Sequence, residues 1–115
     1  MAIPRRFPQN PWPMTELDET AREILQQRWF TLTRQELPEL AMTRDWPVHL
    51  DHCFQRILLD NAAGRPWREM VEPPAYRNAP DDMLLEAVAL GEMVIEGSRD
   101  LGELNRKSLT MRGKL

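Results

Sequence analysis

The sequence predicts an all-α fold, a compact array of four to five helices. Apolar residues recur at three- and four-residue spacing along most of the chain, which is the pattern of helices with one buried face. Runs rich in Val, Ile or Thr in which apolar and polar residues alternate, the pattern of strands, are absent. With 115 residues, of which 42% are hydrophobic, the chain is long enough to form one domain with its own core.

Prolines set off the beginning of the chain. Residues 1–14 contain four of them, Pro4, Pro8, Pro11 and Pro13, and proline resists both helix and sheet. We therefore expect an extended Pro-rich arm over residues 1–14 and a single helical domain over residues 15–115.

Two helix starts lie close together after the arm. The segment TELD at 15–18 is typical of a capping box, which predicts a first helix at about 16–31. Thr33 begins a second capping pattern, and Pro38 is tolerated only in the first turn of a helix, so we expect a separate short helix at about 35–43. The apolar residues expected to face the core here are Leu17, Ala21, Ile24, Leu25 and Leu32.

Three further helices are expected, at about 46–63, 80–97 and 99–109. Gly64 and Gly97 mark the ends of the first two, and Ser98 is the expected cap of the last. The expected inward residues are Leu50, Phe54, Ile57, Leu58, Leu84, Leu85, Val88, Leu90, Val94, Ile95, Leu101, Leu104 and Leu109.

The remaining predictions concern the connection after the third helix and two glycines inside predicted helices. A long connection at about 65–79 should be mostly irregular, with one helical turn at about 67–71. Gly91 and Gly102 each weaken a helix by about 1 kcal/mol relative to Ala, and the expected reason is close contact between helices.

Charge and cysteine content restrict the function classes. A formal net charge of −3 and a sequence pI of about 5.4 argue against a domain built mainly to bind nucleic acid, although Arg5-Arg6 and the basic C-terminal end leave that alternative open. A single cysteine excludes an intramolecular disulfide and suits a reducing compartment. The N-terminus has no apolar signal region, and no apolar run is long enough to cross a bilayer. We expect a soluble cytoplasmic protein without a membrane segment.

The segment HLDHC at 49–53 contains both histidines and the only cysteine. On a helix His49 and Cys53 are four residues apart, so they are candidate zinc ligands, but a structural zinc needs four ligands and the segment offers too few. Cys53 and His52 are alternatively candidate catalytic residues, a nucleophile and a general base. A cysteine on an apolar helix is more commonly a small buried hydrophobe. No cofactor is clearly implied.

The third predicted helix and the following loop form a candidate binding groove. Imidazole, guanidinium and aromatic groups that converge on a groove suit a small anionic or planar ligand, or a protein partner. The alternative is structural: Arg56 and Asp60 would form a surface pair four residues apart, and His52 would tie down the loop through a hydrogen bond. The candidate ligand-binding residues are His52, Arg56, Asp60, Trp67, Tyr76 and Arg77.

Four segments carry a resemblance to a group of proteins: DHCFQRILLDN, GRPW, PPAYRNAPDD and LNRKSLTMRGK. Over residues 45–115 the chain is similar to short uncharacterised bacterial helical proteins with an Asp-His-Cys-Phe core motif, some of which carry the label of a GNAT-type acetyltransferase. That label implies a mixed α/β domain with a Gly-rich turn after a strand for coenzyme A. The sequence shows neither the strand nor the turn.

Two functions follow as expectations. The first is a small helical binding or adaptor protein that acts through the groove between the 46–63 helix and the 65–79 loop. The second is a transferase- or hydrolase-type enzyme that uses His52 as general base and Arg56 as anion holder. An enzyme should have His52 in an open cavity with its ring edge free, whereas a structural His52 should be bonded to loop carbonyls.

Overall fold

Helices make up nearly all of the regular structure in the computed structural model, which describes residues 17–115. No strand occurs in these residues, which confirms the all-α prediction. The predicted Pro-rich arm at 1–14 lies outside the described residues. The elements are α1 (Glu19–Thr31), the π-helical turn η1 (Leu32–Glu36), α2 (Leu37–Ala41), α3 (Asp51–Ala63), the 3-10 turn η2 (Trp67–Glu69), α4 (Ala75–Asn78), α5 (Asp81–Glu96) and α6 (Leu101–Met111).

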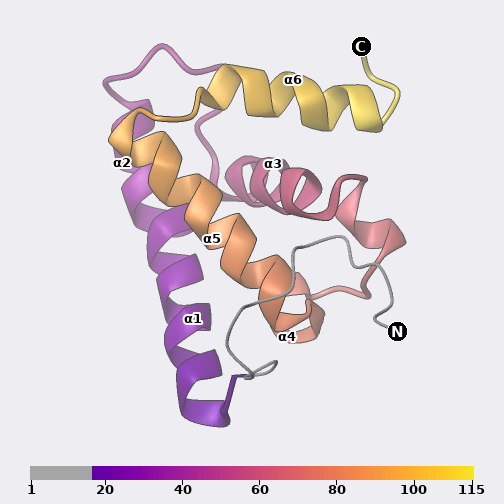
Figure 1. Cartoon of the computed structure of the whole chain (residues 1–115). Coiled ribbons are helices and arrows are strands. Elements are labelled where there is room, and N and C mark those ends of the chain that lie inside the picture. Colours follow the sequence, from indigo (N-terminus) through magenta and orange to yellow (C-terminus); the bar gives the residue numbers. More distant parts are fainter. Residues whose placement is uncertain (1–16) are drawn as a thin grey trace.

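The first and second predicted helices are one continuous helix that runs from α1 through η1 into α2 (Figure 1). The prediction of a break at Thr33 was wrong. Pro38 lacks an N–H group, and its ring needs room near the carbonyl four residues earlier. The wider turn of η1 provides this room, because the Leu37 N–H donates to the Leu32 carbonyl, five residues back. Asp18 caps the start of α1 by accepting from the Ala21 N–H at 2.8 Å, and Thr15 of the predicted capping box lies outside the described residues.

Helix α3 begins at Asp51, five residues later than the predicted start at 46. The preceding segment is not helical because tertiary contacts hold it elsewhere. Trp46 packs edge-on against Phe54, with ring centres 5.8 Å apart, and Val48 packs against the core. At the other end Gly64 adopts the left-handed conformation with φ 77°, as the sequence predicted.

Helices α5 and α6 begin and end at clear local signals. Gly97 ends α5 with φ 90°, as predicted, and Asp81 and Asp82 lie in its first turn, where they complement the helix dipole. Asp100 caps α6 through a 3.1 Å bond from the Glu103 N–H, so the predicted cap at Ser98 and the 99–109 bounds were wrong.

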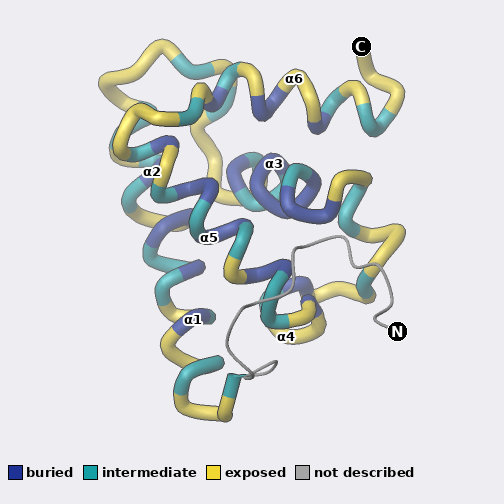
Figure 2. The backbone as a smooth tube through the Cα atoms, in the orientation of Figure 1, coloured by how far each residue is buried: buried dark blue, intermediate teal, exposed yellow. Residues whose placement is uncertain are grey.

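Helix α3 lies at the centre, between α5, α6 and η1, and carries much of the buried surface (Figure 2). The fully buried side chains of the core include Leu32, Leu37, Phe54, Ile57, Leu58, Leu84 and Leu104. Gly91 allows this arrangement, because a Cβ there would lie 2.5 Å from Leu32 Cδ2, which confirms the predicted close contact. Gly102 makes no such contact, since its nearest atoms would lie 3.5 Å away.

Three apolar residues that the spacing placed in the core lie on the surface instead. Ile24 is 65% exposed, Leu50 is 49% exposed and Leu85 is 45% exposed. Leu50 precedes α3 and is therefore not on its buried stripe.

Candidate functional site

A cleft of about 640 Å³ lies between the first turns of α3, the α1–η1 helix and the loop that follows α3. We call it the arginine cleft. One wall comes from α1 and η1, the other from the 67–76 segment, and α3 forms the floor. Its lining consists of Trp29, Phe30, Arg34, His52, Gln55, Arg56, Leu59, Trp67, Arg68, Pro73, Pro74, Ala75, Tyr76 and Arg112. No Asp or Glu of the described chain is among these residues.

Aromatic rings support the arginines on both walls. The Arg34 guanidinium carbon lies 4.0 Å from the centre of the Phe30 ring, because the two residues are four apart on the α1–η1 helix. On the opposite wall the Arg68 guanidinium carbon lies 5.3 Å from the Trp67 ring centre. Phe30 also meets Tyr76 edge-on, with ring centres 4.9 Å apart. The two walls therefore touch through aromatic rings.

The 67–76 wall is tied to α1 through backbone contacts. The Tyr76 carbonyl accepts bonds of 2.9 Å from both Arg22 Nη2 and Gln26 Nε2. Arg22 also pairs with Asp81 at the start of α5, at 2.5 Å. Since an irregular loop has few ladder partners, these bonds fix the position of Tyr76 in the cleft.

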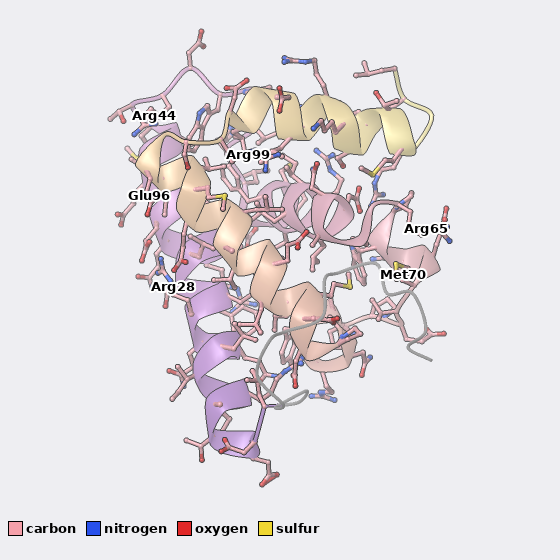
Figure 3. All side chains as sticks on the ribbon, in the orientation of Figure 1. Arg28, Arg44, Arg65, Met70, Glu96 and Arg99 are labelled. Carbon is pink, nitrogen blue, oxygen red and sulfur yellow. The ribbon has the colours of Figure 1, made fainter. Side chains whose placement is uncertain are left out.

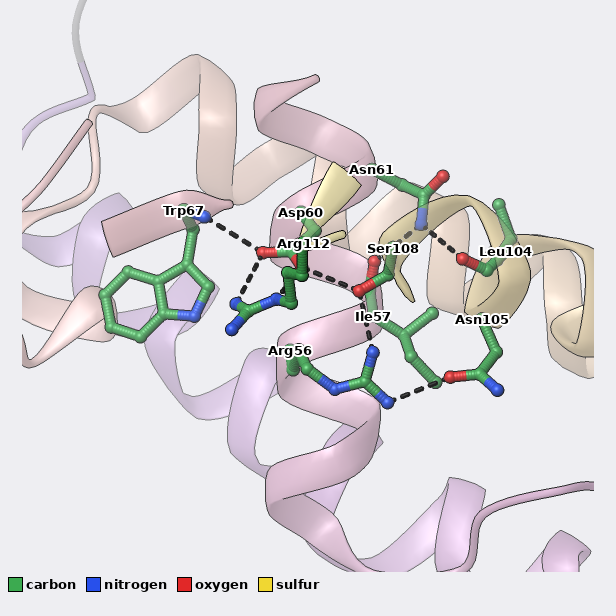
Figure 4. A network of polar contacts seen from close by, with 9 residues as sticks. All are labelled: Arg56, Ile57, Asp60, Asn61, Trp67, Leu104, Asn105, Ser108 and Arg112. Carbon is green, nitrogen blue, oxygen red and sulfur yellow. Dashed lines mark hydrogen bonds and ion pairs between the residues drawn. The ribbon is translucent and has the colours of Figure 1, made fainter. Parts of the chain in front are cut away.

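Behind the cleft floor a buried carboxylate organises a polar network (Figure 4). Asp60 is fully buried and accepts from the Trp67 backbone N–H at 2.9 Å and from the Ser108 hydroxyl at 2.6 Å. Arg112 donates to it through Nε at 2.6 Å and Nη2 at 3.0 Å. Asp60 therefore joins α3, the loop and the end of α6.

Arg56 belongs to the same network without touching the carboxylate. It donates to the Ser108 hydroxyl at 2.7 Å and to Asn105 Oδ1 at 2.9 Å, both on α6. Hydrogen bonding to Asp60 raises the pKa of Arg112 above its ordinary value, against a lowering by burial. In the cleft, then, the charge of Arg112 is compensated by Asp60, while Arg34, Arg56 and Arg68 have no carboxylate partner within residues 17–115.

The structure brings together four of the six candidate binding residues. His52, Arg56, Trp67 and Tyr76 line the arginine cleft. Arg77 lies on a neighbouring depression beside Arg22 and Asp81. Asp60 is buried behind the floor and has all its contacts within the protein.

Both parts of the structural alternative were wrong. Arg56 and Asp60 do not form a surface pair, since Asp60 binds Arg112 and Arg56 binds Ser108. His52 does not tie the loop: its side chain is 73% exposed, and its closest charged contact is Asp51, with Nδ1 3.6 Å from Oδ1.

The cleft residues that sequence reasoning missed include Phe30, Arg34, Arg68 and Arg112. The four-residue spacing of Phe30 and Arg34 on one helix was a usable signal for a stacked pair. Arg112 gave no local signal, because its partner Asp60 lies 52 residues away in the sequence.

The candidate metal and nucleophile positions lie apart from the cleft. His49 is exposed and precedes α3, so the predicted helical spacing between His49 and Cys53 does not exist. Cys53 is half-buried and does not line the cleft. Across residues 17–115, no three His, Cys, Asp or Glu side chains gather closely enough to hold a metal ion.

Comparison of the chain with protein-family models, with curated proteins and with solved structures finds no match. The resemblance to short bacterial helical proteins therefore stays a prediction. The acetyltransferase label implies a mixed α/β domain, and the described residues contain no strand. Within the same residues, no helix has both the length and the apolar character to cross a membrane.

Proposed function

We propose that this chain is a small cytoplasmic helical binding or adaptor protein that captures an anionic ligand in the arginine cleft. The observation that carries the proposal is that Arg34, Arg56 and Arg68 line the cleft and that no carboxylate of residues 17–115 lines it or pairs with them. The whole chain has a formal net charge of −3, so this local positive charge does not follow from composition. The single cysteine supports the cytoplasmic setting.

Guanidinium groups suit this task chemically. They stay charged, and their flat fork of N–H donors matches the oxygens of carboxylates and phosphates. Arg56 uses two N–H groups on Ser108 and Asn105, out of the five that a guanidinium has, so others remain for a ligand. A concave site also keeps water away from these contacts, which strengthens them.

Titration with inorganic pyrophosphate, followed through the arginine Nε–H signals in NMR spectra, tests the proposal. We expect the signals of Arg34, Arg56 and Arg68 to shift along one binding curve. Binding should weaken as salt is added, because partly exposed charges are screened. Unshifted signals, or equal shifts for every exposed arginine, would overturn anion capture in this cleft.

A matched pair of variants locates the binding. Arg34→Gln should weaken pyrophosphate binding about tenfold, the order expected for one lost charge-assisted hydrogen bond. Arg44→Gln is the control, because Arg44 also lies over an aromatic ring, 5.7 Å from the Trp46 centre, but does not line the cleft. Figure 3 shows Arg44 at the opposite end of the molecule from Arg65, where the loop after α3 begins. An equal loss in both variants would assign the binding to general surface charge.

A transferase- or hydrolase-type enzyme is the second candidate, and His52 is the observation that favours it. Its imidazole lines the same cleft as Arg56 and is 73% exposed, so its ring edge can reach a bound ligand. Incubation with pyrophosphate followed by phosphorus NMR separates the two functions. Phosphate that forms with the native chain and not with His52→Gln supports the enzyme, and unchanged pyrophosphate supports binding alone.

A further inference from the structure

We infer that the arginine cleft takes a phosphomonoester of a molecule that also carries a flat aromatic ring, such as a nucleoside monophosphate. The inference rests on the proposed function, because it names the ligand class of the same cleft. Three features of the lining carry it: the number of uncompensated charges, the flat groups on both walls, and the space beyond that needed for one anionic group.

The charges favour a dianion. Asp60 compensates Arg112, which leaves Arg34, Arg56 and Arg68 facing the cleft without a carboxylate partner in the described chain. A single carboxylate neutralises only one such group. A phosphomonoester carries about −1.5 to −2 charge at neutral pH and offers three acceptor oxygens, so it matches three guanidiniums better.

The walls favour a flat ring. On the α1–η1 wall the Arg34 guanidinium carbon lies over Phe30, at 4.0 Å from the ring centre. Arg68 and Trp67 form a similar pair on the loop wall, at 5.3 Å. Guanidinium planes and aromatic faces both stack on planar ligands, and proteins commonly hold nucleobases on such platforms.

The size and apolar lining favour a ligand larger than phosphate. The cleft volume of about 640 Å³ is within the range of small-molecule sites, and a free phosphate would fill only a small part of it. Leu59, Pro74 and Ala75 line it alongside the arginines. Apolar surface of this kind gains from contact with a ring or a sugar and gains nothing from an anion alone.

Calorimetric titration of the full chain with adenosine monophosphate, inorganic phosphate and adenosine tests the ligand class. We expect adenosine monophosphate to bind at least about tenfold more tightly than phosphate, and adenosine to bind more weakly than either, because the ring and the dianion each contribute. Equal binding of phosphate and adenosine monophosphate would overturn the ring assignment while leaving anion capture standing. No binding of any anion, pyrophosphate included, would overturn both.

Two substitutions at one position separate the ring from the charge. Arg34→Lys keeps the cation but loses the flat group, so it should retain phosphate binding within about threefold and lose most of the advantage of adenosine monophosphate. Arg34→Gln should weaken both ligands by about tenfold or more. Arg44→Lys and Arg44→Gln, outside the cleft, should change neither. An advantage of adenosine monophosphate that survives Arg34→Lys unchanged would contradict stacking at this position.

The same titration tests whether the cleft instead binds a phosphomonoester that belongs to a macromolecule. A phosphotyrosine peptide and a 5′-phosphorylated oligonucleotide each carry a phosphomonoester near a ring. Binding of either one at least about tenfold more tightly than adenosine monophosphate would assign the cleft to a peptide or to a strand end and overturn the small-molecule inference. Weaker or equal binding supports it.

Discussion

Asp60 in α3 and Arg112, one residue beyond the end of α6, form a bidentate ion pair in which the carboxylate is fully buried. Arg112 thereby fastens the end of the last helix to the central one, behind the floor of the arginine cleft. Because hydrogen bonding to Asp60 raises the pKa of Arg112, the charged form of Arg112 is favoured by folding. The contribution of this shift to folding stability is fully present when the pH is below the pKa of Arg112 in the unfolded chain. It is lost only when the pH rises through the pKa of Arg112 in the folded chain.

Breaking this pair should be costly. Asp60→Asn leaves Arg112 without its anion, and the loss of one partner of a buried pair costs about 3–5 kcal/mol. Since the Arg112 side chain is 26% exposed and water can reach it, we expect the lower end, about 3 kcal/mol, from urea unfolding. Glu103→Gln is the control, because its contact with Lys107 is exposed and spans 3.8 Å, and it should cost less than about 1 kcal/mol. Similar losses in both variants would contradict the role of the buried pair.

The Ser108 hydroxyl should matter more than its size suggests. It donates to Asp60 and accepts from Arg56, so Ser108→Ala leaves two charged groups short of a partner. We expect a loss of about 1–3 kcal/mol in the free energy of unfolding. Ser98→Ala, at an exposed serine that only contacts the Met93 carbonyl at 3.3 Å, should stay within about 0.5 kcal/mol. A neutral Ser108→Ala would show that the network does not depend on this hydroxyl.

The two helical glycines should respond to alanine with opposite signs. Gly91→Ala forces its Cβ against Leu32 Cδ2, only 2.5 Å away, and against Leu58, so we expect a loss of about 1–3 kcal/mol despite the better helix propensity. Gly102→Ala meets only ordinary contacts at 3.5 Å and should stabilise by up to about 1 kcal/mol. Thermal unfolding of both variants measures this difference, and the same sign for both would rule out close contact at Gly91.

Arg22 should influence the cleft from outside it. It holds the Tyr76 carbonyl and pairs with Asp81, so Arg22→Gln should loosen the 67–76 wall, lower stability by about 1–3 kcal/mol and weaken pyrophosphate binding. Arg28→Gln on the same helix is the matched control. Arg28 pairs with Glu36 and Glu92 at partly exposed positions and should change stability by less than about 1 kcal/mol, with binding unaltered. Unchanged binding in Arg22→Gln would show that the wall does not depend on this residue.

Local signals made much of the fold predictable. Helical spacing, the glycines at 64 and 97 and the acidic start of α5 each act within one or two turns, and the structure has them where the sequence indicated. The candidate groove beside the third helix could also be placed, because His52, Arg56, Trp67 and Tyr76 lie close to one another in the chain. Their short separation in the chain placed them near one another, although Tyr76 is fixed by Arg22 and Gln26 and Arg56 by residues of α6, which lie about 50 residues away.

Tertiary contacts decided the helix boundaries and residue pairs that the sequence did not predict. Some of these contacts overrode the local helix preference, and others join segments that are far apart in the sequence. Thr33 looked like a helix start, yet burial against Trp29 and Gln55 and the wide turn before Pro38 keep the helix continuous. Contact with Phe54 keeps Trp46 outside α3. The sequence by itself determined that helices form and where several of them end. Only the folded chain decided that Asp60 pairs with Arg112 and that Arg34 and Arg68 line the same cleft, because burial and charge select such neighbours from distant segments of the chain.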